Sequence, residues 1–104
     1  MSVYFLANIR INSEEEYQRY LDRSGEIFAR YKGTYLAVDN KPKVLEGEWN
    51  YTRAVLISFD TREDFDAWYH SEEYQEILRH RLSASDCDTI LIQGNQVQLN
   101  IQLQ

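Results

Sequence analysis

The sequence predicts an α+β fold in which four antiparallel strands form one sheet and two helices pack on one face of it. Alternating apolar residues indicate the first strand, and two amphipathic segments with helical spacing each follow a strand. The predicted elements run in the order strand, helix, strand, strand, helix, strand. This is the order of the split βαβ, or ferredoxin-like, arrangement. One face of such a sheet is bare in a single chain, so we expect a second copy to cover it.

Length and charge set limits on the class of protein. The chain has 104 residues, and we place one domain at 1–94 and a C-terminal strand or tail at 95–104. The net charge of −6 disfavours nucleic acids and anionic membranes as partners, because both attract basic surfaces. The single cysteine, Cys87, allows no internal disulfide, so we expect a reducing compartment, the cytoplasm. No apolar run approaches the roughly 18 residues of a membrane helix.

The first strand and helix occupy the first third of the chain. In the strand 3–11 the odd-numbered residues are apolar and should face the helices. Ser13 is a suitable N-cap, and three glutamates follow it where the helix dipole favours negative charge. Apolar spacing of three and four residues continues to Tyr31, and Gly33 is predicted to end the helix in the left-handed conformation.

Two further strands follow this helix. Residues 34–39 predict the second strand, and the run Asp39-Asn40-Lys41-Pro42 indicates a turn, since each of these residues favours tight backbone geometry. The third strand is expected at 51–60, a short apolar run rich in branched and aromatic residues.

Thr61 is the predicted N-cap of the second helix, with Asp64 three residues later as a weak form of the capping box. We expect a kink or a short break near His70-Ser71, because the serine interrupts the helix and acidic residues restart it. The helix should end within 83–86, and the fourth strand should span 88–93.

The last residues, 96–104, predict an extra strand. Apolar residues alternate strictly with Gln and Asn there, which is the period of a strand. The alternating apolar residues are Val97, Leu99, Ile101 and Leu103. Because the tail has an uncharged polar face and no glycine or proline, it should pair with a sheet edge, and a disordered tail is the alternative. Such pairing could also build a higher oligomer.

Three segments carry a resemblance to a known family: YKGTYL, LEGEWNYTRAVLISF and WYHSEEYQEILRHR. They resemble the signature of domain-of-unknown-function family 1330, and the resemblance covers about Tyr4 to Gly94. It departs from the family at Glu72, where a proline is common, and at Asn50-Tyr51, which replaces a proline-containing linker. The resemblance implies a dimeric α/β barrel in which two ferredoxin-like subunits pack sheet to sheet. It implies no chemistry, because the family has no established one.

A homodimer is therefore the expected assembly. Strand alternation selects four residues for the sheet face that should meet the second copy: Tyr4, Leu6, Ala54 and Leu56.

Two arginines are the main candidates for a binding site. Arg53 shares its strand face with apolar residues, and Arg81 lies at helical spacing from Tyr74 and other apolar residues. The second helix runs back along the strand before it, so the strand start and the helix end should meet. One hypothesis is a pocket for a small carboxylate, whose two oxygens match the planar guanidinium. The other is a structural network with Glu46 or Glu48 or with carbonyl groups at the helix end.

Aromatic side chains surround the predicted site. We expect Trp49 and Tyr74 beside the two arginines, either as the wall of a ligand cavity or as ordinary core and interface packing. His70 and His80 are ten residues apart, which is not a metal-binding spacing on one helical face. The sequence predicts no metal site and no cofactor, and it has no phosphate-binding glycine loop.

Three classes of function remain open on the sequence. The first is a protein that binds a small anionic or aromatic molecule in a cavity between sheet and helices. The second is a cofactor-independent enzyme similar to the monooxygenases or isomerases of other dimeric α/β barrels. The third is a structural or assembly module without a ligand. Fold analogy does not choose between binding and turnover.

Overall fold

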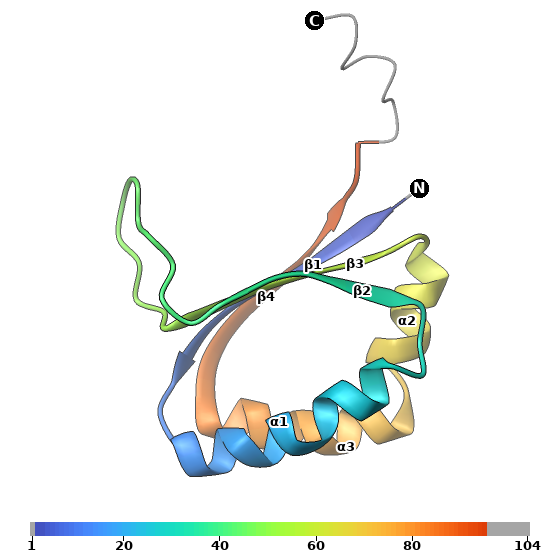
Figure 1. Ribbon diagram of the computed structural model, residues 1–104, viewed down its shortest axis with the longest axis horizontal. Coiled ribbons are helices and arrows are strands. Elements are labelled where there is room, and N and C mark those ends of the chain that lie inside the picture. The colour runs from blue at the N-terminus through green and yellow to red at the C-terminus, as the bar shows by residue number, and fades with distance from the viewer. Residues whose placement is uncertain (1, 96–104) are drawn as a thin grey trace, which may run out of the picture.

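The computed structural model describes residues 2–95, and it shows the predicted ferredoxin-like fold (Figure 1). Its elements are β1 (Val3–Ile11), α1 (Glu14–Phe28), β2 (Gly33–Asp39), β3 (Arg53–Phe59), α2 (Arg62–Tyr69), α3 (Glu72–Ala84) and β4 (Ser85–Gln93). The strands form one antiparallel sheet in the order β2-β3-β1-β4. The predicted C-terminal strand at 96–104 lies outside the described residues. Within 2–95, no helix is long and apolar enough to cross a membrane.

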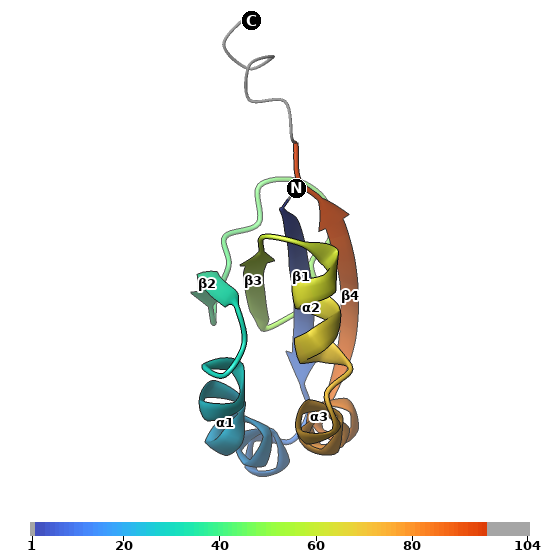
Figure 2. The same ribbon diagram turned by 90° about the vertical axis from the view of Figure 1, so that its right-hand side faces the viewer.

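All the helices lie on one face of the sheet, with α1 under the β2 side and α2 and α3 under the β4 side (Figure 2). The odd-numbered residues of β1 point toward them, and Phe5 and Ile9 are buried as the alternation predicts. We call the opposite side of the sheet the open face. Leu6 lies there between Leu56 and Ile90 on the two neighbouring strands, so an apolar row crosses the open face.

The four residues selected for the interface are half-buried and lie on the open face: Tyr4, Leu6, Ala54 and Leu56. The strand β4 adds Ile90 and Ile92, which are exposed large apolar residues on the same face. An apolar face of this kind is uncommon on a monomer and is typical of an interface.

The first helix begins as predicted but ends earlier. The Ser13 side chain accepts a hydrogen bond from the backbone N–H of Glu16, at 3.3 Å. The prediction that Gly33 caps the helix is wrong, because the helix ends at Phe28 and Gly33 is the first residue of β2 without a positive φ. A side chain at Gly33 would collide with the rings of Phe28 and Phe59. The glycine is therefore needed for close packing of the helix end on the sheet.

The second helical segment is broken where the sequence predicts it. α2 ends at Tyr69, and Ser71 caps α3 by accepting a hydrogen bond from the N–H of Tyr74 at 3.1 Å. Thr61 caps α2 in the same way. The predicted start of the last strand is wrong, since β4 begins at Ser85 rather than at residue 88 and pairs with β1 from there.

The third strand also starts later than predicted, at Arg53 rather than at residue 51. The preceding Thr52 still donates its N–H to the Ile9 carbonyl at 2.8 Å. Tyr51, however, turns away from the ladder, and its hydroxyl bonds to Asp88, an outward-facing residue of β4. The connection 40–52 thus leaves the sheet on the side of the open face.

Candidate functional site

A small cavity lies between the sheet and α1, and both predicted arginines line it. Apolar side chains of β1 and β3 form its floor, among them Ala7 and Val55, while Tyr17 covers it from α1. The cavity volume is about 30 Å³, close to the space that one water molecule occupies in the liquid. The strand start and the helix end therefore meet as predicted, and they bring Arg53 and Arg81 to one place.

Arg81 is the least expected feature of this cavity, because it is only 2% exposed and has no acidic partner among residues 2–95. No ion pair within the described residues involves it, and its Nε and Nη1 atoms are buried without a hydrogen-bond acceptor. Its guanidinium lies 5.7 Å from the centre of the Tyr20 ring, a cation–π contact. Burial opposes the charge, but Tyr74, Tyr20 and Cys87 nearby hold the pKa of Arg81 above its usual value.

Arg53 lies nearer the mouth of the cavity. Its Nη1 donates a hydrogen bond to the side-chain oxygen of Asn40 at 2.6 Å, and its guanidinium lies 5.9 Å from the centre of the Tyr17 ring. Its Nε atom is buried without an acceptor. The predicted alternative, a network with Glu46 or Glu48, is absent from the described part of the chain, where neither arginine has a carboxylate within ion-pair distance.

Tyr74 lies behind the cavity rather than in its wall. It is 1% exposed and its ring packs 4.3 Å from that of Trp68, centre to centre. Its hydroxyl and that of Tyr20 are 2.7 Å apart and share a hydrogen bond. Burial raises the pKa of both hydroxyls, so the pair is neutral at physiological pH. Tyr74 also interacts with Arg81, whose charge opposes the rise in the pKa of Tyr74. The predicted neighbour therefore lies beside one of the two arginines, and it supports Tyr20, which contacts Arg81 as well.

Trp49, the fourth predicted site residue, is in a different place. It lies in the connection 40–52 with its ring 5.0 Å from that of Tyr51, and it lines a separate surface hollow of about 370 Å³ beside Leu45. The structure does not bring it to the cavity, because β3 begins only at Arg53 and the residues before it turn toward the open face.

A wider groove adjoins the cavity on the outside. Its volume is about 230 Å³, and it shares Tyr17, Leu21 and Arg53 with the cavity. Arg53 therefore stands between the small inner cavity and an outer groove that is several times larger. The sequence suggested neither Tyr17 nor Tyr20 for the site, because their helical spacing is that of ordinary core residues.

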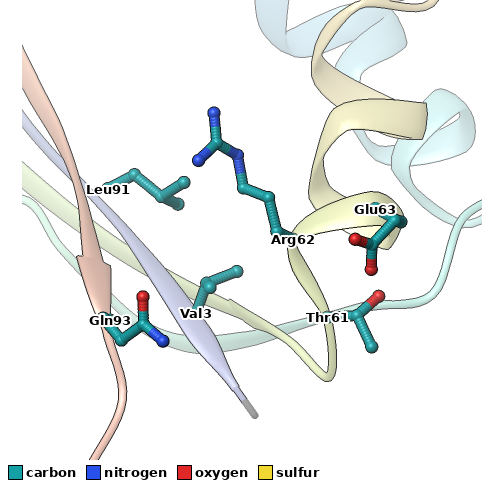
Figure 3. A pocket seen from close by; sticks show the side chains of 6 residues that line it. All are labelled: Val3, Thr61, Arg62, Glu63, Leu91 and Gln93. Atoms are coloured by element: carbon teal, nitrogen blue, oxygen red, sulfur yellow. The ribbon is translucent and has the colours of Figure 1, made fainter.

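Another hollow lies at the opposite end of the sheet, where α2 begins (Figure 3). It has a volume of about 300 Å³, and Arg62 extends across it toward Leu91. This arginine differs from Arg81, since its side chain is 64% exposed and pairs with Asp66 at 3.4 Å. The hollow at Arg62 is thus a surface groove with a solvated charge. The smaller cavity contains Arg81, whose buried nitrogens have no hydrogen-bond acceptor.

The remaining candidate groups belong to local contacts. His80 Nδ1 lies 2.5 Å from a carboxylate oxygen of Glu16 and joins α3 to α1. The thiol of Cys87 lies 3.0 Å from the hydroxyl of Ser85. Residues 2–95 contain no cluster of three His, Cys, Asp or Glu side chains that could hold a metal ion.

Comparison with known families and structures supports the resemblance seen in the sequence. The family DUF1330, described as a domain of unknown function, matches residues 2–95, which confirms the predicted family. No curated protein matches the chain. A protein of unknown function from Rhodopseudomonas palustris has a similar structure, with a TM-score of 0.77 and 18% identity over 91% of this chain and 83% of that one.

Two other solved structures share the fold. A protein from Thermobifida fusca, described as dimeric, ferredoxin-like and of unknown function, has a TM-score of 0.65 and 16% identity over 88% of this chain and 90% of that one. SnoaB from Streptomyces nogalater, a cofactor-independent oxygenase, has a TM-score of 0.65 and 13% identity over 93% and 96% of the two chains. At these identities the likeness is one of fold.

Proposed function

This chain belongs to DUF1330, a family of unknown function, and we propose that it is a homodimer that binds a small carboxylate between Arg53 and Arg81. One observation carries the ligand site: the buried Arg81 lines a cavity with two guanidinium nitrogens unsatisfied and no acidic partner among the described residues. A buried donor without an acceptor costs about 1–3 kcal/mol, so an anion whose oxygens accept from Nε and Nη1 would relieve a cost already present in the fold.

The shape of the site favours a carboxylate over a larger anion. The inner cavity of about 30 Å³ suits a planar group of few atoms, and a guanidinium can bind two carboxylate oxygens at once. The rest of the ligand would pass Arg53 into the outer groove, where the apolar and aromatic surfaces of Leu21 and Tyr17 suit a flat or aliphatic body. A small monocarboxylic acid is the ligand class that this arrangement fits best.

The homodimer rests on the open face of the sheet. An apolar row that includes Leu6, Leu56 and Ile90 crosses this face in a single chain. Burial of that row in a symmetric interface would stabilise both copies. The proposal is limited to binding, because the likeness to an oxygenase is one of fold and a fold does not define an activity.

Thermal unfolding with and without carboxylate tests the ligand site. Sodium acetate and sodium benzoate should raise the Tm of the wild type, relative to sodium chloride at the same ionic strength. A ligand at ten times its Kd stabilises the fold by about 1.4 kcal/mol, which is roughly 6–11 °C for a domain of this size. Arg53→Met should remain folded and lose this shift.

Arg62→Met is the matched control, since Arg62 is an exposed arginine that lines the hollow at the other end of the sheet. It should keep the full shift. If Arg53→Met kept the shift, or if Arg62→Met lost it, the carboxylate would bind elsewhere and the proposed site would be wrong. Native mass spectrometry of the wild type would show any ligand retained from the cell together with the mass of the dimer.

A further inference from the structure

The connection between β2 and β3, residues 40–52, is long for a hairpin and has no helix or strand of its own. Hairpin loops usually have about 2–5 residues, and a long connection without regular structure is commonly functional. We call residues 40–52 the arm. Figures 1 and 2 both show the arm projecting from the sheet on the side opposite the helices.

Contacts at the base of the arm agree with this direction. The hydroxyl of Tyr51 bonds to Asp88, which lies on the open face of β4, so the end of the arm crosses that face at one side. Trp49 packs edge-on against Tyr51, with the two ring centres 5.0 Å apart. The arm is therefore continuous with the open face, and anything that covers this face meets the arm.

The tip of the arm exposes apolar side chains between the charged residues Lys43 and Glu46. Leu45 is 83% exposed, the highest exposure among the large apolar residues, and Val44 beside it is also exposed. Together with Pro42 and Trp49 they border the hollow of about 370 Å³ described above. Such a group of apolar side chains on a projecting segment is typical of a contact surface.

We propose that the arm clasps a second copy of this chain. The copy that covers the apolar row on the open face would also lie alongside the arm, so this copy is the partner that the arm contacts. In a two-fold symmetric dimer each arm would contact the other copy, so the interface contains the contact twice. The inference goes beyond the sheet-to-sheet dimer proposed above, since the arm contacts would be additional to those of the sheets.

Sedimentation equilibrium on three charge substitutions tests the arm separately from the sheet. Leu45→Asp should raise the dimer Kd at least about tenfold, because burial of two leucine side chains is lost per dimer. Leu6→Asp, on the open face, should dissociate the dimer if the sheets pack together. Leu82→Asp on α3 is the control, since Leu82 is 58% exposed but belongs to the helical layer, and it should leave the Kd unchanged.

Circular dichroism establishes that each variant is folded, and hydrogen exchange supplies a measurement that needs no variant. Amides of residues 43–48 should exchange more slowly in wild type above the dimer Kd than below it. If the wild type is a dimer and the Leu45→Asp variant has the same dimer Kd, the arm contact would be overturned and the sheet interface would remain. Unchanged exchange at 43–48 would also overturn it, and a wild type that is monomeric would overturn both interfaces but not the carboxylate site.

Discussion

Replacement of Arg81 by methionine should leave the protein equally stable or make it more stable when no carboxylate is present. Methionine keeps the apolar stem that packs against the core and removes the charged group. A residue kept for binding contributes little to the stability of the empty protein, and such residues often reduce it. Arg81 is therefore a direct test of whether the cavity is a site or part of the structural core.

The magnitude follows from the contacts of the guanidinium. Its Nε and Nη1 atoms are buried without acceptors, and each unsatisfied polar group costs about 1–3 kcal/mol. The cation–π contact with Tyr20, at 5.7 Å, offsets about 0.5–2 kcal/mol of this cost. Two such groups cost about 2–6 kcal/mol, so Arg81→Met should raise the free energy of unfolding by about 0–5.5 kcal/mol. The interactions of Arg81 with Tyr74 and Cys87 place the expected gain toward the lower end of this range. At roughly 4–8 °C per kcal/mol, a gain would be visible as a higher Tm.

Urea unfolding followed by circular dichroism, at one fixed protein concentration and in a carboxylate-free buffer, measures this change. Arg79→Met is the control, because Arg79 is exposed on the same helix, and its free energy of unfolding should stay within about 0.5 kcal/mol of wild type. If Arg81→Met instead lost about 3–5 kcal/mol, Arg81 would be a member of a structural network and the binding hypothesis would lose its main support.

Two further predictions concern packing and pH. Gly33→Ala should lower the free energy of unfolding by about 1–3 kcal/mol, since the new methyl group would lie 2.7 Å from a ring carbon of Phe59. Gly25→Ala should raise the free energy of unfolding by about 0.5–1 kcal/mol, because Gly25 lies in the interior of α1 with open space around it. Equal changes in the two urea titrations would contradict this reasoning. The pKa values of three carboxyl groups are lowered in the fold, chiefly by hydrogen bonds with other side chains, and these are Glu16 with His80, Glu73 with Tyr31 and Asp86 with Arg10. Because their folded pKa lies below the unfolded one, the stability that they contribute is complete above the ordinary values of 4.5 and 3.8 and is lost as the pH falls through the lower folded values. The urea concentration at the unfolding midpoint should thus decrease as the pH is lowered from 5 to 3, and Glu73→Gln should make this decrease smaller. A midpoint that stays constant over this pH range would refute the assignment.

Local signals in the sequence determined most of the fold. The alternation in β1, the cap at Ser13 and the break at Ser71 were all predicted, because each depends on residues within a few positions along the chain. The convergence of Arg53 and Arg81 was also predictable, since the direction of a helix after its strand and the lengths of the two elements bring the strand start and the helix end together.

Tertiary structure alone decided which partners the site residues have. Tyr20 contacts Arg81 from another helix, and Trp49 lies outside the cavity because the chain leaves the ladder before Arg53. Gly33 proved to be a packing glycine, because its constraint comes from the rings of Phe28 at the end of α1 and of Phe59 in a different strand. Residue spacing defines the faces of a helix or strand, but the burial of a charge and the identity of its neighbours depend on side chains that are distant in the chain and meet only when the sheet and helices pack together.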